Sequence, residues 1–431
     1  MRLNDLQRLM LGWDELHPYN ALDLVEVRRP ITAAEVQHAA EQERLLHGLG
    51  PARIDARHGI CIFQPEASRV QVETIEPLPD ESTEQTLERH MAVELNRRFL
   101  LAQDVPIRLA VVRTRPNPFV VFTYHHWLCD GLTGGYLFRR ILARLLGIAL
   151  DDEPRWVFAD ALDESAIFGS WHRWPFDTAL AWELLREVVT STTIYVPRHP
   201  DPFDPIVDVY LLATPPDALA QVRRTARANG GTVNDVLMAV VARAVDAVLP
   251  ERRRQRWQRT LTLGNIVNMR PLASDALRHR AGNHLSFALM HCPPDLPRDF
   301  RQLIRHLHRQ SARSKEGRYF LASLTAFRCT RLLWPWMPQR WRRSFVENGV
   351  RMTACLSNLV YPAEWYGPAW TDLLGTYWRG VPTGYTSPLL IGITTTRGVL
   401  TLQLTAHRSG YDAGQVQEIR RRVEEGLRAD C

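Results

Sequence analysis

The sequence predicts a protein of the mixed α/β (α+β) class that is built from two lobes. At 431 residues, the chain is longer than one hydrophobic core usually supports. Strand patterns alternate with amphipathic helix patterns in the first part of the chain, and the same alternation returns in the last part. Between these parts, residues 151–205 are rich in Pro, Asp and Trp and hold one good helix pattern, near 176–189. We therefore expect an N-terminal lobe over residues 1–172, a connection over 173–206 and a C-terminal lobe over 207–431.

The first lobe is predicted to alternate short strands with helices. Strands are expected at 21–28, 59–64, 70–75, 107–112 and 119–124, and helices at 32–46, 83–96 and 132–146. Residues 119–122 are all apolar, which is typical of a strand buried on both faces. The helix over 132–146 places several leucines, Phe138 and Ile141 on one stripe, and Gly147 is positioned to end it.

The second lobe repeats this theme. Strands are expected at 208–213, 260–269, 284–290, 352–359, 390–396 and 399–405, and helices at 217–229, from 232 onward, at 299–313 and from about 412. Thr232 and Asp235 have the spacing of a capping box, in which two side chains at a helix start bond each other's backbone amides. The helix that follows is apolar nearly all round, which predicts that it is buried.

The net charge of +6 comes almost entirely from arginine, since Lys315 is the sole lysine. One interpretation of this charge is a biased composition with a solvated basic surface. The other is a binding surface for a polyanion such as nucleic acid, an anionic membrane, a phosphate-bearing cofactor or an acidic carrier protein. The sequence contains no metal-finger spacing and no aromatic RNA-binding motif, which argues against a nucleic-acid partner.

Several absences bear on where the protein acts. No run of about 18 apolar residues is present, so we expect no membrane-spanning helix. The first seven residues are too polar to open a signal peptide. The cysteines are scattered, without a CxxC pair, at Cys61, Cys129, Cys292, Cys329, Cys355 and Cys431. This pattern argues against a disulfide framework or a structural zinc site and favours a reducing, cytoplasmic location.

The stretch most informative about chemistry follows the apolar strand at 119–124. Two histidines, His125 and His126, leave the strand, and Asp130 and Gly131 then open a helix. A histidine near neutral pH can take a proton from an alcohol or an amine. Gly131 would let the backbone approach a reacting carbonyl, and amides at the helix start would stabilise a developing oxyanion. Asp130 is expected to be structural, and a carboxylate at this turn needs a cation, for which arginine is the natural partner.

Other interpretations of this stretch remain open. Both histidines are compatible with a plain core role. His126 and Asp130 have a spacing that metal ligands also use, but no third ligand stands in a suitable motif such as HExxH. A serine hydrolase is disfavoured because the chain has no GxSxG turn. We therefore expect no metal.

The pattern HHxxxDG after a buried strand resembles the signature of the condensation-domain superfamily of acyltransferases. That superfamily includes nonribosomal peptide condensation domains, polyketide-associated acyltransferases and wax ester synthase/diacylglycerol acyltransferase enzymes. Further matches follow in the right order over most of the chain, at Tyr19-Asn20, Thr232 to Leu237, Asn268-Met269-Arg270, Gly282-Asn283 and Ser357-Asn358. Two family elements are missing: the first helix lacks His-x-x-Leu-Arg, and DFGWG is absent.

The resemblance implies two chloramphenicol-acetyltransferase-like lobes that form a V around a central substrate tunnel. His126 of the His125-His126 pair would be the general base, Asp130 would pair with Arg270 to hold the loop, and Asn358 would line the tunnel or fasten the lobes. Arg270 as plain surface and Asn358 as a turn residue are the alternatives.

The resemblance further implies transfer of an acyl group from a thioester to a small-molecule hydroxyl or amine, without a covalent intermediate. The donor would be acyl-CoA or a phosphopantetheinyl carrier protein, and no tightly bound cofactor is expected. We find no carrier-protein or adenylation segment, and therefore expect a stand-alone, monomeric enzyme that takes its donor in trans. The alternatives are amide condensation of two carrier-bound substrates and a catalytically silent binding module.

One further segment, residues 328–345, combines Trp334, Trp336 and Trp341 with five arginines. This composition suits a peripheral membrane contact, the mouth of a lipid-chain site or an acidic carrier, but also ordinary aromatic packing with a solvated arginine rim. Pro335 and Pro338 are expected to break any long helix here.

Overall fold

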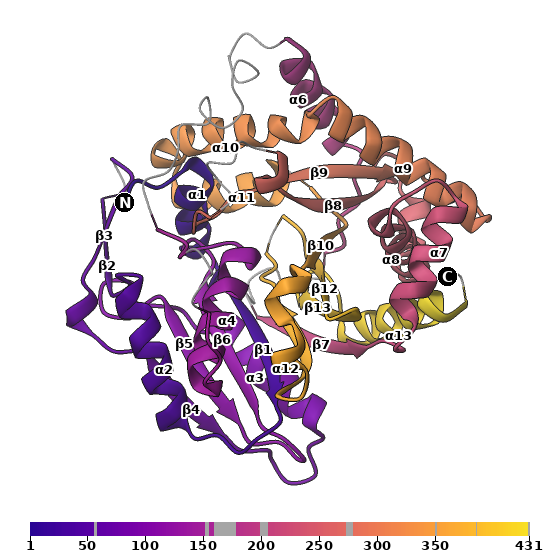
Figure 1. Ribbon diagram of the computed structural model, residues 1–431. Helices are drawn as coiled ribbons and strands as arrows, with labels where there is room; N and C mark the ends of the chain where they lie inside the picture. Colours follow the sequence, from indigo (N-terminus) through magenta and orange to yellow (C-terminus); the bar gives the residue numbers. More distant parts are fainter. Residues whose placement is uncertain are drawn as a thin grey trace. The chain divides into compact units, whose positions relative to one another are not determined.

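Residues 1–55, 58–150, 155–158, 178–198, 206–272, 279–349, 351–384 and 386–429 are described by the computed structural model of the chain. They form two compact units, each built around a β-sheet (Figure 1). Unit 1 comprises Met1–His172, Asn268–His284 and Leu359–Pro382, and unit 2 comprises Arg173–Val267, Leu285–Asn358 and Thr383–Cys431. The predicted mixed α/β class with two sheet-based lobes is confirmed.

Neither unit is a continuous stretch of chain, whereas the lobe boundaries expected from the sequence assume continuity. Residues 268–284 and 359–382 group with unit 1 because they supply a strand and many hydrogen bonds to it. The parts of the expected connection at 173–177 and 199–205 lie outside the described residues, as does Cys431. The V arrangement and the tunnel between the lobes stay predictions.

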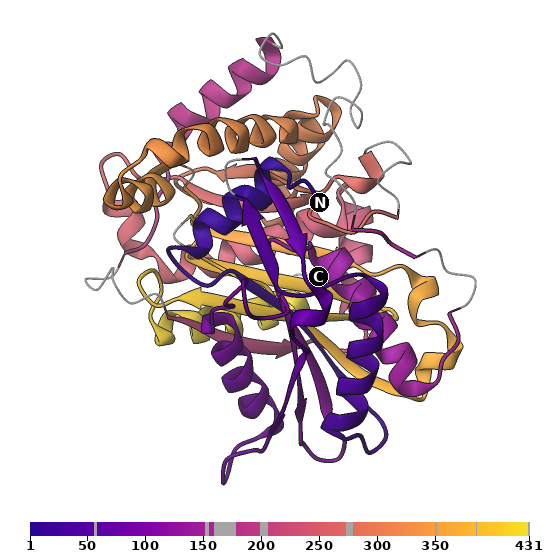
Figure 2. The ribbon, with the colours of Figure 1, turned by 90° about the vertical axis from the view of Figure 1, so that its left-hand side faces the viewer.

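Unit 1 is a five-stranded sheet with helices on both faces (Figure 2). In spatial order the strands are β11 (Leu374–Gly380), β1 (Asn20–Val27), β6 (Phe119–His125), β5 (Ile107–Val112) and β4 (Gln71–Ile75). The pair β4 and β5 is parallel, and the other neighbours are antiparallel. The helices are α1 (Asp5–Asp14), α2 (Ala33–Leu46), α3 (Thr83–Asn96) and α4 (Gly131–Leu146), and a small hairpin joins β2 (Ala52–Asp55) to β3 (Ile60–Phe63).

Side-chain alternation along β1 sets which helix covers which face. Asn20 donates hydrogen bonds to the carbonyls of Glu94 and Arg97 at the end of α3. On the opposite face, Phe122 of β6, the strand partner of Asp23, stacks on Phe138 of α4. Every residue of β6 is buried, as its apolar sequence predicted, so this strand delivers its last residues to the interior of the unit.

Helix α4 begins and ends at the residues that the sequence indicated. The side chain of Asp130 caps the helix by accepting a hydrogen bond from the amide of Thr133 at 2.9 Å. Gly147 ends it in the left-handed conformation, with φ of 70°. The turn between β6 and α4 is therefore fixed at both sides by regular structure.

Unit 2 holds a six-stranded sheet. In spatial order its strands are β7 (Val207–Ala213), β13 (Val399–His407), β12 (Leu389–Thr396), β10 (Ala354–Val360), β8 (Leu261–Asn268) and β9 (Leu285–Cys292). Its longer helices are α6 (Thr178–Ser191), α7 (Ala218–Ala228), α8 (Val233–Val248), α9 (Phe300–Glu316), α10 (Ala322–Leu333), α11 (Gln339–Gly349) and α13 (Ala413–Ala429). Helix α8 carries the predicted capping box of Thr232 and Asp235 and is buried along most of its length, since it packs against α7, α9 and α13 (Figure 1).

Short helical turns complete the described chain. They are η1 (Pro65–Ala67), η3 (Pro250–Arg254), η4 (Arg270–Leu272), η6 (Tyr319–Leu321), η7 (Trp334–Trp336), η8 (Ala363–Tyr366) and α12 (Pro368–Thr371). The expected break at Pro335 and Pro338 is confirmed, because α10 ends at Leu333 and α11 begins at Gln339. Among the helices that the structure describes, none has the length and apolar character needed to cross a bilayer.

Candidate active site

His126 lies directly after β6, in the turn that leads to α4. Its backbone amide donates to the carbonyl of Tyr19 at 2.8 Å, and the Tyr19 ring stacks on the imidazole with centroids 5.6 Å apart. The ring nitrogen Nδ1 lies 2.9 Å from the carbonyl oxygen of Cys129. A carbonyl can only accept, so Nδ1 carries the proton and Nε2 carries the lone pair. The turn thus holds the imidazole in the tautomer that a general base needs.

Burial determines the charge state of this histidine. The side chain is buried, which lowers the pKa of His126 to about 4, although the Cys129 carbonyl and the charge of Asp130 oppose the shift. The ring is therefore neutral at neutral pH and available to accept a proton.

Asp130 and Arg270 form a buried ion pair within unit 1. The carboxylate of Asp130 also accepts a hydrogen bond from the backbone amide of His284 at 2.9 Å, in addition to the one from the amide of Thr133. Burial alone would raise the pKa of Asp130, but the charge of Arg270, with His284 and these hydrogen bonds, outweighs it and holds the pKa below its usual value. The pairing expected for Asp130 and Arg270 is present, and it keeps the carboxylate ionised.

Arg270 also reaches beyond Asp130. It donates to the Thr133 hydroxyl at 2.8 Å and to the carbonyl of Arg280 at 3.1 Å. Its guanidinium lies over the ring of Trp156, 5.3 Å from the centroid. One arginine therefore ties the start of α4 to the segment 268–284.

The same segment holds the backbone of the turn that contains His126. The side-chain amide of Asn283 donates to the His126 carbonyl at 2.7 Å, and the Asp130 amide donates to the Gly282 carbonyl at 3.1 Å. Gly282 and Asn283, which were predicted only as a short motif match, thus bind the two ends of the turn between His126 and Asp130. Among the described residues, no group of three His, Cys, Asp or Glu side chains is placed to hold a metal ion.

Gly131 is required by its neighbours. A Cβ at this position would stand 2.5 Å from a guanidinium nitrogen of Arg379 and 3.2 Å from Leu359. Arg379 is buried on β11, opposite Asp23 of β1. A glycine here lets a buried cation reach the start of α4, a reason that the motif alone does not reveal.

His125 has a different environment from His126. It is fully buried, its Nε2 lies 3.3 Å from the carboxylate of Asp14, and its ring contacts Phe99 and Trp127. These contacts fasten α1 to the end of β6, which is a packing role. Of the two expectations for His125, a place in the catalytic HHxxxDG motif and a plain core role, these surroundings favour the core role.

Asn358 lies in unit 2, on β10, apart from the other predicted site residues, which all belong to unit 1. Its side-chain amide lies 3.5 Å from the Asn234 side-chain oxygen, and Asn234 donates to Asn265 at 3.1 Å. The three asparagines join β10, α8 and β8. Its expected part in a tunnel stays a prediction.

A buried polar cluster of Asp23, Tyr361 and Tyr377 was not predicted from the sequence. The Tyr361 hydroxyl donates to Asp23 at 3.0 Å, and the Tyr377 hydroxyl lies 3.3 Å from that of Tyr361. Burial raises the pKa of Asp23 to about 6, although Arg379 and the two tyrosines oppose the shift. The available signal was Asp23, one of two acidic residues in the largely apolar strand over 21–28, which strand patterns alone do not assign to a site.

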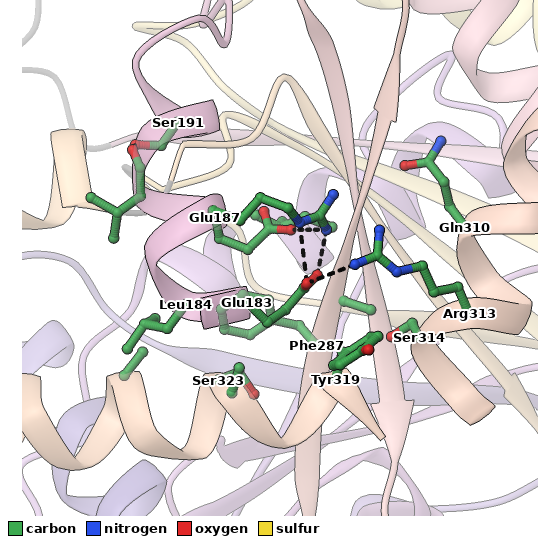
Figure 3. A pocket seen from close by; sticks show the side chains of 16 residues that line it. Glu183, Leu184, Glu187, Ser191, Phe287, Gln310, Arg313, Ser314, Tyr319 and Ser323 are labelled. Carbon is green, nitrogen blue, oxygen red and sulfur yellow. Dashed lines mark hydrogen bonds and ion pairs between the residues drawn. The ribbon is translucent and has the colours of Figure 1, made fainter. Parts of the chain in front are cut away.

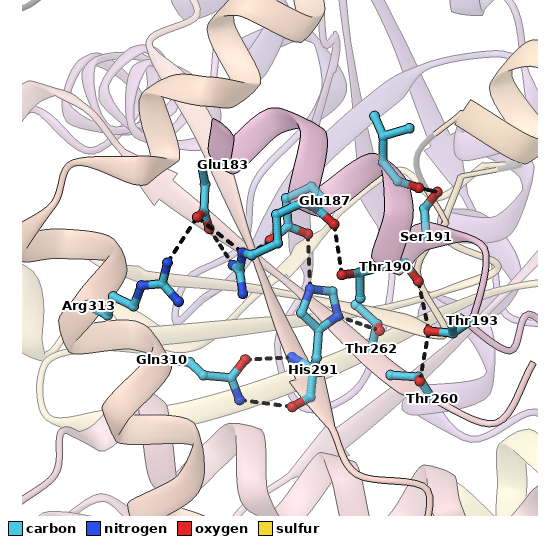
Figure 4. A network of polar contacts seen from close by, with 12 residues as sticks. Glu183, Glu187, Thr190, Ser191, Thr193, Thr260, Thr262, His291, Gln310 and Arg313 are labelled. Atoms are coloured by element: carbon cyan, nitrogen blue, oxygen red, sulfur yellow. Dashed lines mark hydrogen bonds and ion pairs between the residues drawn. The ribbon is translucent and has the colours of Figure 1, made fainter. Parts of the chain in front are cut away.

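Unit 2 contains a largely apolar cavity of about 90 Å³ between α6, α9, α10 and β9 (Figure 3). The buried carboxylate of Glu183 points toward it and accepts from Arg186 at 3.1 Å and from Arg313 at 3.2 Å. On the same helix, Glu187 lies 2.9 Å from the ring of His291, which also contacts Thr262 (Figure 4). These charges are paired with one another, so the network anchors α6 on α9 and β9.

Comparison with known proteins finds solved structures with the same architecture. No family model matches the chain, and no curated protein matches it in sequence. The first condensation domain of the calcium-dependent antibiotic synthetase, in complex with a substrate analogue, matches with a TM-score of 0.66 at 17% identity, over 99% of this chain and 96% of that one. A mutant starter condensation domain of rhizomide synthetase, in complex with C8-CoA and Leu-SNAC, matches with a TM-score of 0.63 at 14% identity, over 99% and 93%. The epimerization domain from the third module of tyrocidine synthetase B matches with a TM-score of 0.61 at 13% identity, over 99% and 96%.

The chain therefore has the condensation-domain fold, and the resemblance stated from its motifs is confirmed at the level of the fold. The match extends over almost the whole of this chain and of each of these structures. Since condensation and epimerization domains share the fold, the reaction has to be argued from the site.

Proposed function

We propose that the protein is an acyltransferase that moves an acyl group from a CoA or carrier-protein thioester to a hydroxyl or amine acceptor. The observation that carries the proposal is the neutral, correctly protonated imidazole of His126, held at the turn between β6 and α4. The fold supports it, since one structural neighbour is a starter condensation domain in complex with C8-CoA and Leu-SNAC.

In the proposed reaction, Nε2 of His126 takes the proton of the acceptor O–H or N–H as its oxygen or nitrogen attacks the thioester carbonyl carbon. The tetrahedral intermediate collapses by breaking the carbon–sulfur bond. The departing thiolate then takes the proton back from the imidazolium, so His126 ends neutral and the acyl group is never bound to the protein. The start of α4 at Gly131 places the positive end of the helix dipole next to this turn, where negative charge develops.

Other residues act by holding His126 in place. The ion pair between Asp130 and Arg270 fixes the turn, and the hydrogen bond from Asn283 fixes the backbone of His126. His125 is occupied with Asp14, so we assign the base role to His126 alone.

Condensation of two carrier-bound substrates into an amide is the second candidate, because another structural neighbour is a condensation domain of an antibiotic synthetase. It uses the same base and differs in requiring carrier proteins on both sides. Dependence of the rate on carrier-bound rather than CoA-bound donor separates the two candidates.

The test is release of free thiol from a panel of acyl-CoAs in the presence of mixed alcohols and amines. His126→Ala is expected to lower the rate by about 100-fold to 10,000-fold, the usual contribution of a general base. His58→Ala is the matched control, because the His58 side chain is largely exposed at the β2–β3 turn. Both variants should keep the wild-type circular dichroism spectrum.

The outcomes separate the candidates. Acceptor-dependent thiol release that survives in His58→Ala and is lost in His126→Ala supports the proposal. Release only from acyl-carrier proteins selects the carrier-dependent candidate. An unchanged rate in His126→Ala contradicts the base assignment, and inactivity with every donor favours a catalytically silent binding module.

A further inference from the structure

The corner between α10 and α11 exposes an unusual group of apolar side chains. Leu332 and Leu333 end α10 and are 54% and 52% exposed. Trp336 in η7 and Trp341 in α11 are 85% and 60% exposed. Water-facing tryptophans and leucines gathered in one short segment are unfavourable unless another surface covers them.

The corner is shaped to protrude. Pro335 follows the end of α10 and Pro338 precedes the start of α11, so the two helices are separated between Leu333 and Gln339. Trp334 is buried and lies under the guanidinium of Arg342, at 5.4 Å, which gives the turn a packed base. A side chain that is 85% exposed, as Trp336 is, has few neighbours on any side and therefore stands on a convex surface.

The charged side chains along the corner segment all have one sign. Residues 328–343 contain five arginines, and no Asp or Glu occurs anywhere in residues 317–346. Arg328 and Arg340 are exposed. A run with this composition produces a positive potential that attracts an anionic surface.

We propose that residues 328–343, the tryptophan–arginine corner, bind the surface of an anionic phospholipid membrane. Trp and Leu side chains would enter the interface between headgroups and acyl chains, while the arginines would remain among the phosphates. A convex apolar tip with a basic rim matches this layer better than it matches the surface of a folded acidic protein, which would need a groove to receive two tryptophans.

The test is co-sedimentation of the full chain with vesicles. The wild type should bind vesicles of phosphatidylcholine and phosphatidylglycerol in equal amounts, bind far less to phosphatidylcholine alone, and release as salt is raised. The double variant W336S/W341S should lower the partition coefficient at least about tenfold, because it removes the apolar contribution. R328Q/R340Q should also lower it by about tenfold or more, since each basic residue near an anionic surface contributes about 1 kcal/mol.

Trp257→Ser is the matched control. Trp257 is 73% exposed and lies 5.5 Å from the guanidinium of Arg256, but it does not belong to the corner. This variant should bind vesicles as the wild type does. Failure of the wild type to bind anionic vesicles overturns the proposal, and so does an equal loss in Trp257→Ser and the double variant.

A soluble acidic acyl carrier protein is the competing partner. If the wild type binds such a protein and ignores the vesicles, and the corner variants lose that binding, the corner is a protein-docking surface and the membrane proposal is wrong. Because none of these measurements uses thiol release, failure here leaves the proposed acyl transfer unaffected.

Discussion

At the scale of a single residue, the environment of His126 sets its charge state at each pH. A histidine in water has a pKa near 6.5, so about a quarter of it is charged at pH 7. Burial beside Tyr19 removes water from the ring and lowers the pKa of His126 to about 4. The ring is therefore neutral and able to accept a proton over the whole neutral range.

The first prediction concerns the pH profile of the reaction. If His126 is the base, kcat/KM should stay level as the pH falls from 8 to about 5 and should decline with an apparent pKa of about 4. The measurement is thiol release across this range, on enzyme shown by circular dichroism to be folded at each pH. A decline centred near 6.5 would contradict the assignment, because it would report an ordinary, solvated histidine.

The same shifts predict how stability depends on pH. Burial lowers the pKa of both His126 and His284 to about 4. Between about pH 6.5 and pH 4 these two rings bind protons in the unfolded chain but not in the folded one, so their contribution lowers the free energy of unfolding as the pH falls, and the raised pKa of Asp23 offsets part of it. Urea titrations at a series of pH values measure this slope, and a stability that rises toward pH 4 would show that the burial of these rings is wrong.

At the scale of structural elements, the site is a turn between a strand and a helix that a distant segment holds in place. Strand β6 and helix α4 bring His126 and Asp130 to the turn, and residues 268–284 supply Arg270 and Asn283 to fix it. Because Asp130 is fully buried, its charge is tolerable only while the arginine remains.

Arg270→Ala is predicted to destabilise the protein by about 3–5 kcal/mol, since it leaves a buried carboxylate without its cation. Thermal or urea unfolding measures the loss. Adding Asp130→Asn to this variant should recover part of it, because the second change removes the unpaired charge and keeps a side chain that can cap α4.

Arg113→Ala is the matched control. Arg113 pairs with Glu76 at the surface, where both side chains are 61% exposed, and its loss should change stability by no more than about 0.5 kcal/mol. A normal melting temperature for Arg270→Ala would refute the role given to the ion pair.

At the scale of the whole molecule, each unit is assembled from segments that are far apart in the sequence. Unit 1 takes its edge strand β11 from residues 374–380, and residues 268–284 supply the hydrogen bonds that hold the turn containing His126. The contiguous piece over 1–172 therefore contains the HHxxxDG motif without the elements that complete its sheet and hold its turn.

We predict that the fragment 1–172 alone does not unfold cooperatively. It would expose the edge of β1, including the buried Leu22 and Leu24, and would leave Asp130 without Arg270. Thermal unfolding followed by circular dichroism, with the full chain as the control, measures this. A sharp transition in the fragment would mean that β11 and the segment 268–284 are dispensable for the fold of unit 1.

The sequence predicted what depends on neighbours along the chain. The periods of apolar residues indicated most strands and helices to within two or three residues, including β5, α3 and β6, because a side chain's face follows from its position in the element. Segments with weak or short patterns were missed: α1, β2, β11, α10 and α11. Strand β11, for example, is stabilised mainly by pairing with β1, a partner more than 340 residues away, as Tyr377 opposite Val25 illustrates.

For the site, residue types and spacing along the chain were enough to predict a histidine able to act as a base, an aspartate that needs a cation, and a glycine at the start of a helix. The resemblance also named Arg270 as the partner of Asp130, whereas the contact of His125 with Asp14 and the contact of Arg379 with Gly131 are known only from the folded chain. The physical reason is that residue type and spacing set local conformation, whereas burial, pKa and ion pairing depend on which distant side chains the fold brings to the same place.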